Sequence, residues 1–258
     1  MTTSLAFSEL TARVKKFSRA ELLRLDAKDV AEIDWTLKDA RCAESVACFD
    51  RGPLYWLTRH TKTENPQHEA QGLPFLAPFP RKSYFVPLFA EFLARHSVLF
   101  IPKSRTMLSS WSAMGFATWA AKFRREETVV QTLNEDRAAH LIDYVRQLWD
   151  NQEDWLKARH PLNRRSGFAI AWAGGGEVAA IASGADKIRA LHPTTYVQDE
   201  SAFLPDGEQS LAAVMPTGAR IIAISSAHPG WFGDQVTLYE KRRNRDRAAG
   251  SESRQFLT

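Results

Sequence analysis

The sequence predicts an α/β protein with a mainly parallel central β-sheet and helices on both of its faces. From residue 97 onward, short β-prone apolar runs alternate with longer segments of helical periodicity, which is the pattern of strand–helix–strand units. Three of the apolar runs end in charged or hydroxyl residues. In open α/β sheets, ligands bind at the carboxyl edge of the strands, so these polar residues are candidates for one common site.

Residues 1–50 are predicted to form a small N-terminal helical unit. Apolar residues recur there at roughly helical intervals, at Leu22, Leu25, Val30, Ile33 and Leu37. Residues 52–87 are rich in Pro, Gly, His and aromatic residues, which predicts an irregular segment that lies over the core. A short helix is expected at 88–95.

The second part of the chain carries the predicted sheet. Strands are expected at 98–101, 128–132, 168–172, 178–182, 195–198 and 220–225. The clearest helix covers 134–149, where Asn134 can cap the first turn and one face carries an apolar stripe. After Tyr239 the sequence is charged and poor in apolar residues, which indicates the end of a domain or a linker. We therefore expect three units, at 1–50, 51–245 and 246–258.

Composition limits the function classes. A formal net charge of +4 is compatible with a polyanionic partner but does not require one. No uninterrupted apolar run approaches a membrane span and no signal-peptide pattern opens the sequence, so we expect a soluble intracellular protein with no membrane partner. Cys42 and Cys48 have no partner pair and no histidine at metal-ligand spacing, which indicates neither a zinc site nor a disulfide framework.

The first candidate site lies in "VLFIPKSRTMLSSW" (98–111), which predicts a strand, a tight turn and the start of a helix. This context can bind phosphate, because the loop amides and the helix N-terminus direct partial positive charge at one point. Lys103 and Arg105 add cations, and Ser109 and Ser110 add hydroxyls, but the glycines of the usual P-loop are missing. Taken alone, the stretch is better explained as a basic turn with serine caps.

Two further strands end in residues that suit phosphate chemistry. In "TTYVQDESAF", Asp199 can lie near a metal and Glu200 can polarise a water for attack on a phosphate. In "ARIIAISSAHPGWF", Ser225 and Ser226 follow a neighbouring strand and can sense that phosphate. A solvated acidic turn and hydroxyls that satisfy a turn are the plainer alternatives. The occurrence of all three motifs at strand ends, in this order, favours the functional interpretation.

With these residues in place, the chain resembles the ATPase domain of the large terminase subunit, the motor that packages DNA in tailed bacteriophages. "KSRTMLSSW" resembles the variant Walker A motif of that family, and "YVQDESAF" resembles its Walker B motif with the catalytic glutamate. "IIAISSAHPGWF" is similar to its coupling motif, and "SGADKIRALHPTTYVQDE" to the segment with an arginine ahead of Walker B. The resemblance runs from about Cys42 to Tyr239, and the order and spacing of the motifs carry it.

The resemblance implies a P-loop NTPase fold of the ASCE type, a three-layer sandwich preceded by an N-terminal helical and irregular extension. It places the ATPase domain at 51–245 and a linker toward an absent nuclease domain at 246–258. It implies ATP and Mg²⁺ as cofactors. The residues implied to contact the nucleotide form the loop Lys103, Ser104, Arg105, Thr106, Met107, Leu108, Ser109 and Ser110.

The resemblance also implies individual roles. Lys103 would bind the β and γ phosphates and Ser110 would hold Mg²⁺, with Asp199 completing the metal site through water. Glu200 would activate the attacking water. The remaining implied roles are those of the loop arginine Arg105, the arginine Arg189 that reaches a neighbouring subunit's nucleotide, and the coupling pair Ser225 and Ser226. Arg189 is equally well explained as an ordinary surface arginine.

The sequence departs from the family pattern at three positions. Thr106 stands where glutamine is usual, and Ala190 stands where glycine commonly follows the arginine. Leu108 replaces the loop glycine at a position that can need positive φ, which is costly for a bulky residue. No adenine-reading glutamine is evident upstream, so Tyr84 or Phe85 is the candidate to stack on the base.

The function implied is ATP-driven translocation of double-stranded DNA into a viral procapsid. The expected partners are DNA, the portal protein, the small terminase subunit and further copies of this chain in a ring, in the host cytoplasm. DNA contacts would be mostly to phosphate, with candidates at Arg164, Arg165 and 241–247. Two alternatives remain open: another P-loop translocase or helicase, and a degenerate nucleotide-binding or DNA-binding module in which Leu108 has abolished hydrolysis.

Overall fold

The computed structural model describes residues 38–65, 68, 71–94, 98–104, 107–184, 188 and 191–248. Most of the predicted N-terminal helical unit and residues 249–258 lie outside these residues. The described part of that unit is helix α4 (Lys38–Asp50). The charged segment after Tyr239 belongs, as far as Ala248, to helix α13 (Trp231–Ala248). Among the described residues, no helix is long and apolar enough to cross a bilayer.

A seven-stranded sheet forms the centre of the molecule, in the order β3-β9-β8-β4-β7-β6-β5. The first five strands in this order pair in parallel, and β6 and β5 add an antiparallel edge. The predicted mainly parallel sheet is therefore confirmed. The strands are β3 (Val98–Lys103), β4 (Glu127–Thr132), β5 (Leu162–Arg165), β6 (Ala169–Trp172), β7 (Glu177–Ala182), β8 (Thr195–Asp199) and β9 (Arg220–Ser226).

Both faces of the sheet are apolar and buried. In β9, Ile222 and Ile224 face one hydrophobic core, whereas Ile221 and Ala223 face a second core on the opposite side. The side chains of a strand alternate between faces, so a strand buried on both sides has a continuous apolar sequence. This is why the run "RIIAIS" could be recognised as a strand despite its lack of polar alternation.

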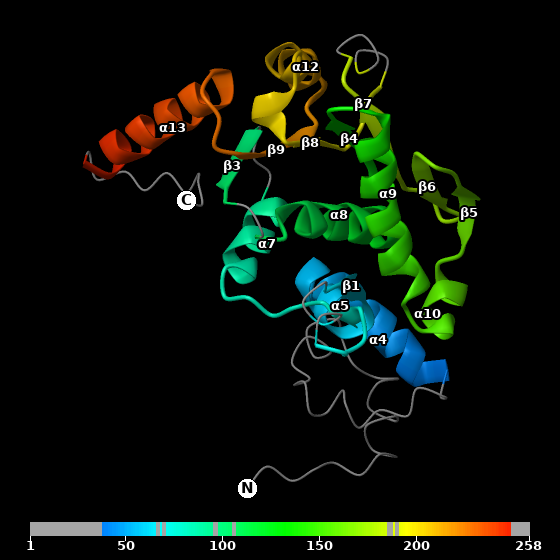
Figure 1. The fold of residues 1–258 in the computed structure, drawn as a ribbon. Coiled ribbons are helices and arrows are strands. Elements are labelled where there is room, and N and C mark those ends of the chain that lie inside the picture. Colours follow the sequence, from blue (N-terminus) through cyan, green and yellow to red (C-terminus); the bar gives the residue numbers. More distant parts are fainter. Residues whose placement is uncertain are drawn as a thin grey trace, which may run out of the picture.

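Helices cover each face and complete a three-layer sandwich (Figure 1). On one face lie α8 (Ser109–Trp119) and α9 (Glu135–Asp150), and on the other lie α12 (Gly207–Val214) and the start of α13. The Asn134 side chain caps α9 as predicted, because its Oδ1 accepts the backbone N–H of Arg137 at 2.9 Å. Helix α8 is buried almost all round, since α4, α5 and α7 cover the side that faces away from the sheet.

The segment predicted to be irregular is more regular than expected. It contains α5 (Pro53–His60) and an antiparallel pair of short strands, β1 (Lys62–Glu64) and β2 (Leu76–Pro78). Proline at the first helical position is pre-organised for a helix start, so Pro53 opens α5 instead of breaking it. Helix α7 (Phe85–Leu93) likewise begins before Pro87, because a first-turn proline loses no intrahelical hydrogen bond.

Strand β5 was not predicted from the sequence, because its residues are mostly polar and exposed at the sheet edge.

The shorter elements complete the fold. They are the π-helix η1 (Ala120–Arg124), helix α10 (Asp154–Arg159) and the 3₁₀ turns η2 (Ser201–Phe203) and η3 (Met215–Thr217).

Candidate active site

The predicted site residues converge at the carboxyl edge of three neighbouring strands. Lys103 ends β3, Asp199 ends β8, and Ser226 ends β9, which lies between the other two. Lys103 and Ser226 are register partners. Ser110, in the first turn of α8, reaches the same edge, and these four residues line a cavity of about 490 Å³ together with Glu200.

Lys103 and Glu200 form an ion pair, with 2.7 Å between Nζ and Oε1. The second carboxylate oxygen of Glu200 accepts the hydroxyl of Ser226 at 3.2 Å and its backbone N–H at 3.4 Å. Burial acts to raise the pKa of the Glu200 carboxyl, but the Lys103 ammonium and the Ser226 donors outweigh burial and leave this pKa below its usual value. Glu200 is thus held as a carboxylate.

Asp199 and Ser110 form the second pair, in which the Ser110 hydroxyl donates to Oδ1 at 2.7 Å. Asp199 is 8 % exposed, and this burial raises the pKa of its carboxyl despite the bond from Ser110. A carboxylate and a hydroxyl side by side are hard oxygen ligands of the kind Mg²⁺ prefers. The donor set therefore fits a magnesium ion, whose positive charge would offset the cost of burying the charged carboxylate.

The glycine-free loop has the left-handed backbone that its sequence position suggested. Leu108 has φ 53° and ψ 26° and stands directly before the first residue of α8. Its side chain packs against the larger hydrophobic core, and its carbonyl accepts the N–H of Ser112 at 2.8 Å. Tyr84 secures the neighbouring residue by donating its hydroxyl to the Met107 carbonyl at 3.0 Å. Packing and hydrogen bonds thus stabilise a loop conformation that glycine usually supplies.

Leu108→Ile is expected to lower the free energy of unfolding by about 1 kcal/mol more than Leu108→Met does, because a β-branched side chain is least compatible with positive φ. Both replacements nearly conserve side-chain volume, so they separate backbone strain from packing. Urea denaturation of the two variants measures this difference. Equal losses of stability would show that the left-handed conformation of this loop carries no such strain.

The other loop residues are placed as follows. Ser104 is exposed at the end of β3, and Ser109 is buried at the start of α8. Arg105 and Thr106, together with Arg189, lie outside the described residues, so their roles stay predictions.

Ser225 and Ser226 both contact the segment that carries Glu200. Ser225 is fully buried, and its hydroxyl oxygen accepts the N–H of Ala202 at 3.1 Å. Ser226 binds Glu200 itself, as described above. A displacement of Glu200 would therefore act directly on β9, because Glu200 contacts both the side chain and the backbone N–H of Ser226.

Helix α9 contributes residues that the sequence did not single out. Arg137, His140 and Tyr144 line the cavity, and Tyr144 stacks on Trp111 of α8 with ring centroids 4.0 Å apart. These residues recur at i, i+3 and i+7, which is the spacing of one helical face. That spacing was visible in the sequence, but nothing in it showed that the face is directed at the carboxyl edge of the sheet.

The suggestion that Phe85 stacks on a base is wrong, because Phe85 is fully buried among Phe79, Tyr84 and Phe89. Tyr84 is partly buried and lies next to the loop. It remains a candidate for that contact.

Comparisons with known proteins identify one group of similar structures. No protein-family model and no curated protein sequence matches this chain. Among solved structures, the HK97 bacteriophage large terminase is similar, with a TM-score of 0.54 and 10% identity over 76% of this chain and 41% of that chain. The Thermus phage P74-26 large terminase ATPase domain gives a TM-score of 0.42 with 17% identity, covering 67% of this chain and 73% of that chain.

A third similar structure is the large terminase of a thermophilic bacteriophage in complex with ADP. It has a TM-score of 0.41 and 12% identity, and the match covers 64% of this chain and 49% of that chain. The chain spans about two fifths of the HK97 protein. On its fold, the chain therefore matches the large terminase of a bacteriophage, the group whose motifs its sequence resembles.

Proposed function

We propose that this chain binds ATP with Mg²⁺ and hydrolyses it. The observation that carries the proposal is the convergence of Lys103, Ser110, Asp199 and Glu200 on one cavity at the carboxyl edge of a parallel sheet. A cation, a pair of oxygen ligands and a second carboxylate are the parts that phosphoryl transfer to water requires. Lys103 lies on β3, Ser110 on α8, and Asp199 and Glu200 at the end of β8, so the four meet only in the folded protein.

Lys103 and the N-terminus of α8 would bind the phosphates, since both direct positive charge at the cavity. Ser110 and Asp199 would hold the magnesium ion, which supplies positive charge that stabilises the transferring phosphoryl group. The phosphates would compete with Glu200 for the Lys103 ammonium. Nucleotide binding would thereby release Glu200 from its 2.7 Å ion pair for a second task.

The released carboxylate of Glu200 would act as the base. It would orient a water whose oxygen attacks the γ-phosphorus, and the bond to the β–γ bridging oxygen would break. The water proton would pass to the Glu200 carboxylate or to the phosphate, and the products would be ADP and inorganic phosphate. The contact between Glu200 and Ser226 supports a coupling role for β9, because the loss of phosphate would change that contact.

We further propose that the activity drives double-stranded DNA into a procapsid. The motif order and the shared fold support this finer proposal. It includes the portal protein, a small terminase subunit and a ring of copies in the host cytoplasm as partners and setting, with Arg105 and Arg189 in their predicted roles.

The candidate DNA contacts differ in availability. Arg164 and Arg165 pair with Glu177 and Asp150 on the protein itself, so DNA would have to displace these acids. Lys241 and Arg242 are exposed on α13, which starts against β3 and extends outward (Figure 1). The proposal therefore favours α13 over β5 as the DNA-contacting element.

The test is Mg²⁺-dependent release of phosphate from ATP by the wild type and by Lys103→Met, with Lys62→Met as the matched control because Lys62 is exposed on β1. We expect turnover to fall by roughly 10²–10³-fold in Lys103→Met and to be unchanged in the control. Equal turnover by the wild type and Lys103→Met would overturn the assignment. Nucleotide binding without turnover in the wild type would favour the alternative of a binding module.

Translocation is tested separately, by adding double-stranded DNA of mixed sequence to the same assay. Stimulation of turnover should be independent of sequence and should weaken as salt rises, because phosphate contacts release counterions. If turnover does not respond to DNA at any salt concentration, the proposal of DNA translocation is overturned. The proposal of ATP hydrolysis is not affected by that result.

A further inference from the structure

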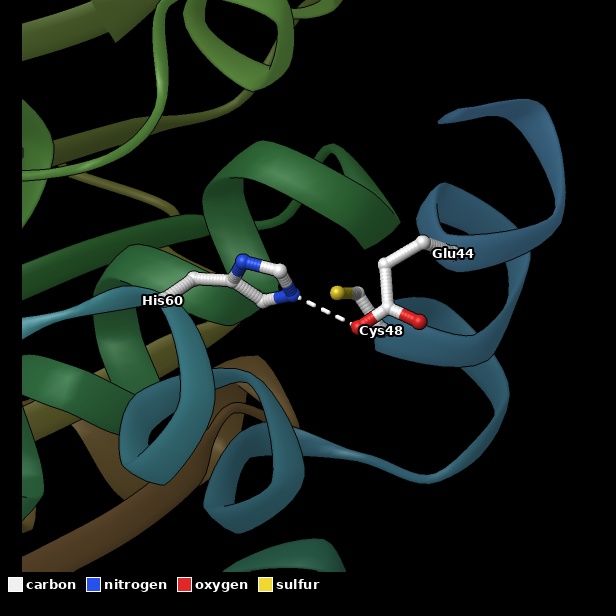
Figure 2. Close-up of side chains that lie close together, drawn as sticks. All are labelled: Glu44, Cys48 and His60. Atoms are coloured by element: carbon white, nitrogen blue, oxygen red, sulfur yellow. Dashed lines mark hydrogen bonds and ion pairs between the residues drawn. The ribbon is translucent and has the colours of Figure 1, made fainter. Parts of the chain in front are cut away.

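A second cluster of reactive side chains lies outside the cavity, between helices α4 and α5. Glu44 and Cys48 stand one turn apart on α4, and His60 is the last residue of α5 (Figure 2). One ligand atom from each lies within 4.8 Å of the others. All three residues are buried, with exposed fractions of 1%, 0% and 5%. Three potential ligands thus face one another where water is largely excluded.

The orientation of His60 matches that of a metal-bound imidazole. Its Nδ1 lies 2.9 Å from Oε2 of Glu153, and its Nε2 lies 2.7 Å from Oε1 of Glu44. Histidines that bind a metal through one nitrogen almost always direct the other at a carboxylate or carbonyl, which sets the tautomer. The Nδ1–H would donate to Glu153, and a metal ion would take the place of the Nε2 proton that the 2.7 Å contact with Glu44 requires in the metal-free site.

Two negative or electron-rich groups face Nε2 of His60. The sulfur of Cys48 lies beside the same nitrogen as the carboxylate of Glu44, as Figure 2 shows. One N–H can donate to one of them at a time, so a single proton does not satisfy both. A cation between the three ligand atoms would satisfy all of them together.

We propose that Glu44, Cys48 and His60 bind a zinc ion. Thiolate, imidazole and carboxylate together are zinc ligands, whereas Mg²⁺ and Ca²⁺ prefer oxygen alone. Two ligands at i and i+4 share one face of α4, and the third comes from the following helix. The ion would join α4 to α5 and, through Glu153, to the start of α10.

The charges around the cluster are compatible with this ion. Glu44 and a Cys48 thiolate supply two negative charges, which equal the charge of Zn²⁺, and the displaced thiol proton leaves to solvent. Arg59 Nε and Tyr55 Oη donate to the Glu44 carboxylate at 2.6 and 3.0 Å and hold it in place.

The sequence indicated no zinc site at the cysteines, and the proposal departs from that expectation. That expectation rested on sequence spacing, because His60 lies twelve residues from Cys48, farther apart than the paired ligands of common zinc motifs. The turn between α4 and α5 brings the two helices into contact, so His60 and Cys48 lie close together despite their distance in the sequence. The proposal is also independent of ATP, since no residue of the cluster lines the nucleotide cavity.

The experiment is titration of chelator-treated protein with cobalt(II), a spectroscopic substitute for zinc, followed by displacement with zinc. We expect a thiolate-to-cobalt charge-transfer band that zinc abolishes, and a zinc ion retained per chain by elemental analysis. Cys48→Ser should lose the band. Cys42→Ser is the matched control, because Cys42 lies on the same helix outside the cluster, and it should keep the band.

A further variant tests the positioning role of Glu153. Glu153→Gln leaves all three ligands in place and is expected to weaken zinc binding by roughly 10–100-fold. Absence of a thiolate band in wild type would overturn the proposal even if Cys48→Ser does not fold. A band that persists in Cys48→Ser, or that disappears in Cys42→Ser, would overturn it as well and would leave His60 as a protonated bridge between two carboxylates.

Discussion

Glu200→Gln is expected to lower ATP turnover by about 10²–10⁴-fold, which is the usual contribution of a general base. Glutamine preserves the shape of the side chain and can still accept a hydrogen bond from Ser226. It has no negative charge with which to attract the proton of the attacking water. The expected loss therefore appears in kcat, measured as phosphate release at saturating ATP.

The same variant should bind nucleotide at least as tightly as the wild type. In the wild type, the Lys103 ammonium is engaged by Glu200 at 2.7 Å, and the phosphates must displace that partner. Removal of the negative charge weakens this competition and leaves Lys103 free for phosphate. Fluorescent nucleotide binding at equilibrium measures this effect apart from turnover.

Glu208→Gln is the matched control, because Glu208 is exposed on α12 and carries the same change in charge. It should leave both turnover and affinity unchanged. Wild-type turnover in Glu200→Gln would show that Glu200 is not the base. A parallel loss of turnover and of nucleotide binding would show that Glu200 holds the site together instead of acting in the chemical step.

Gly176→Ala is expected to destabilise the protein by about 3 kcal/mol or more, the largest effect on stability that the fold suggests. Gly176 ends the turn between β6 and β7 and has φ +90°. A Cβ there would collide with the backbone oxygen of Ala121 in the π-helix η1 and would lie 2.9 Å from the carbonyl carbon of the same residue. Backbone atoms cannot rotate away, so either η1 or the turn must shift.

Gly175→Ala separates the clash from the backbone strain. Gly175 has nearly the same φ, +91°, but its Cβ would meet only the Arg125 side chain at 3.7 Å. We expect Gly175→Ala to lower the free energy of unfolding by about 1 kcal/mol, because that is the cost of a left-handed backbone conformation for alanine. Urea denaturation of the pair measures the difference. Equal losses would show that η1 yields to the added methyl group and that the contact carries no cost.

Much of the fold, and the polar residues at the ends of β3, β8 and β9, are evident in the chain itself. The strand runs are continuous and apolar because both faces of the sheet are buried, and Asn134 caps α9 because that interaction spans only a few residues. The loop position of Leu108 could likewise be recognised as one that needs left-handed backbone. Local hydrogen bonds and side-chain periodicity depend on neighbours in sequence, so they can be predicted from sequence.

The partners of the site residues could not be predicted in this way. The Lys103–Glu200 ion pair joins residues 97 positions apart, and the inward face of α9 is defined only by its packing on α8. His60 reaches Cys48 only because α4 and α5 fold against each other. The sequence by itself determined which chemical groups the protein has and which strand ends carry them. The tertiary structure decided which of them meet, because contacts between distant segments depend on how whole helices and strands pack together.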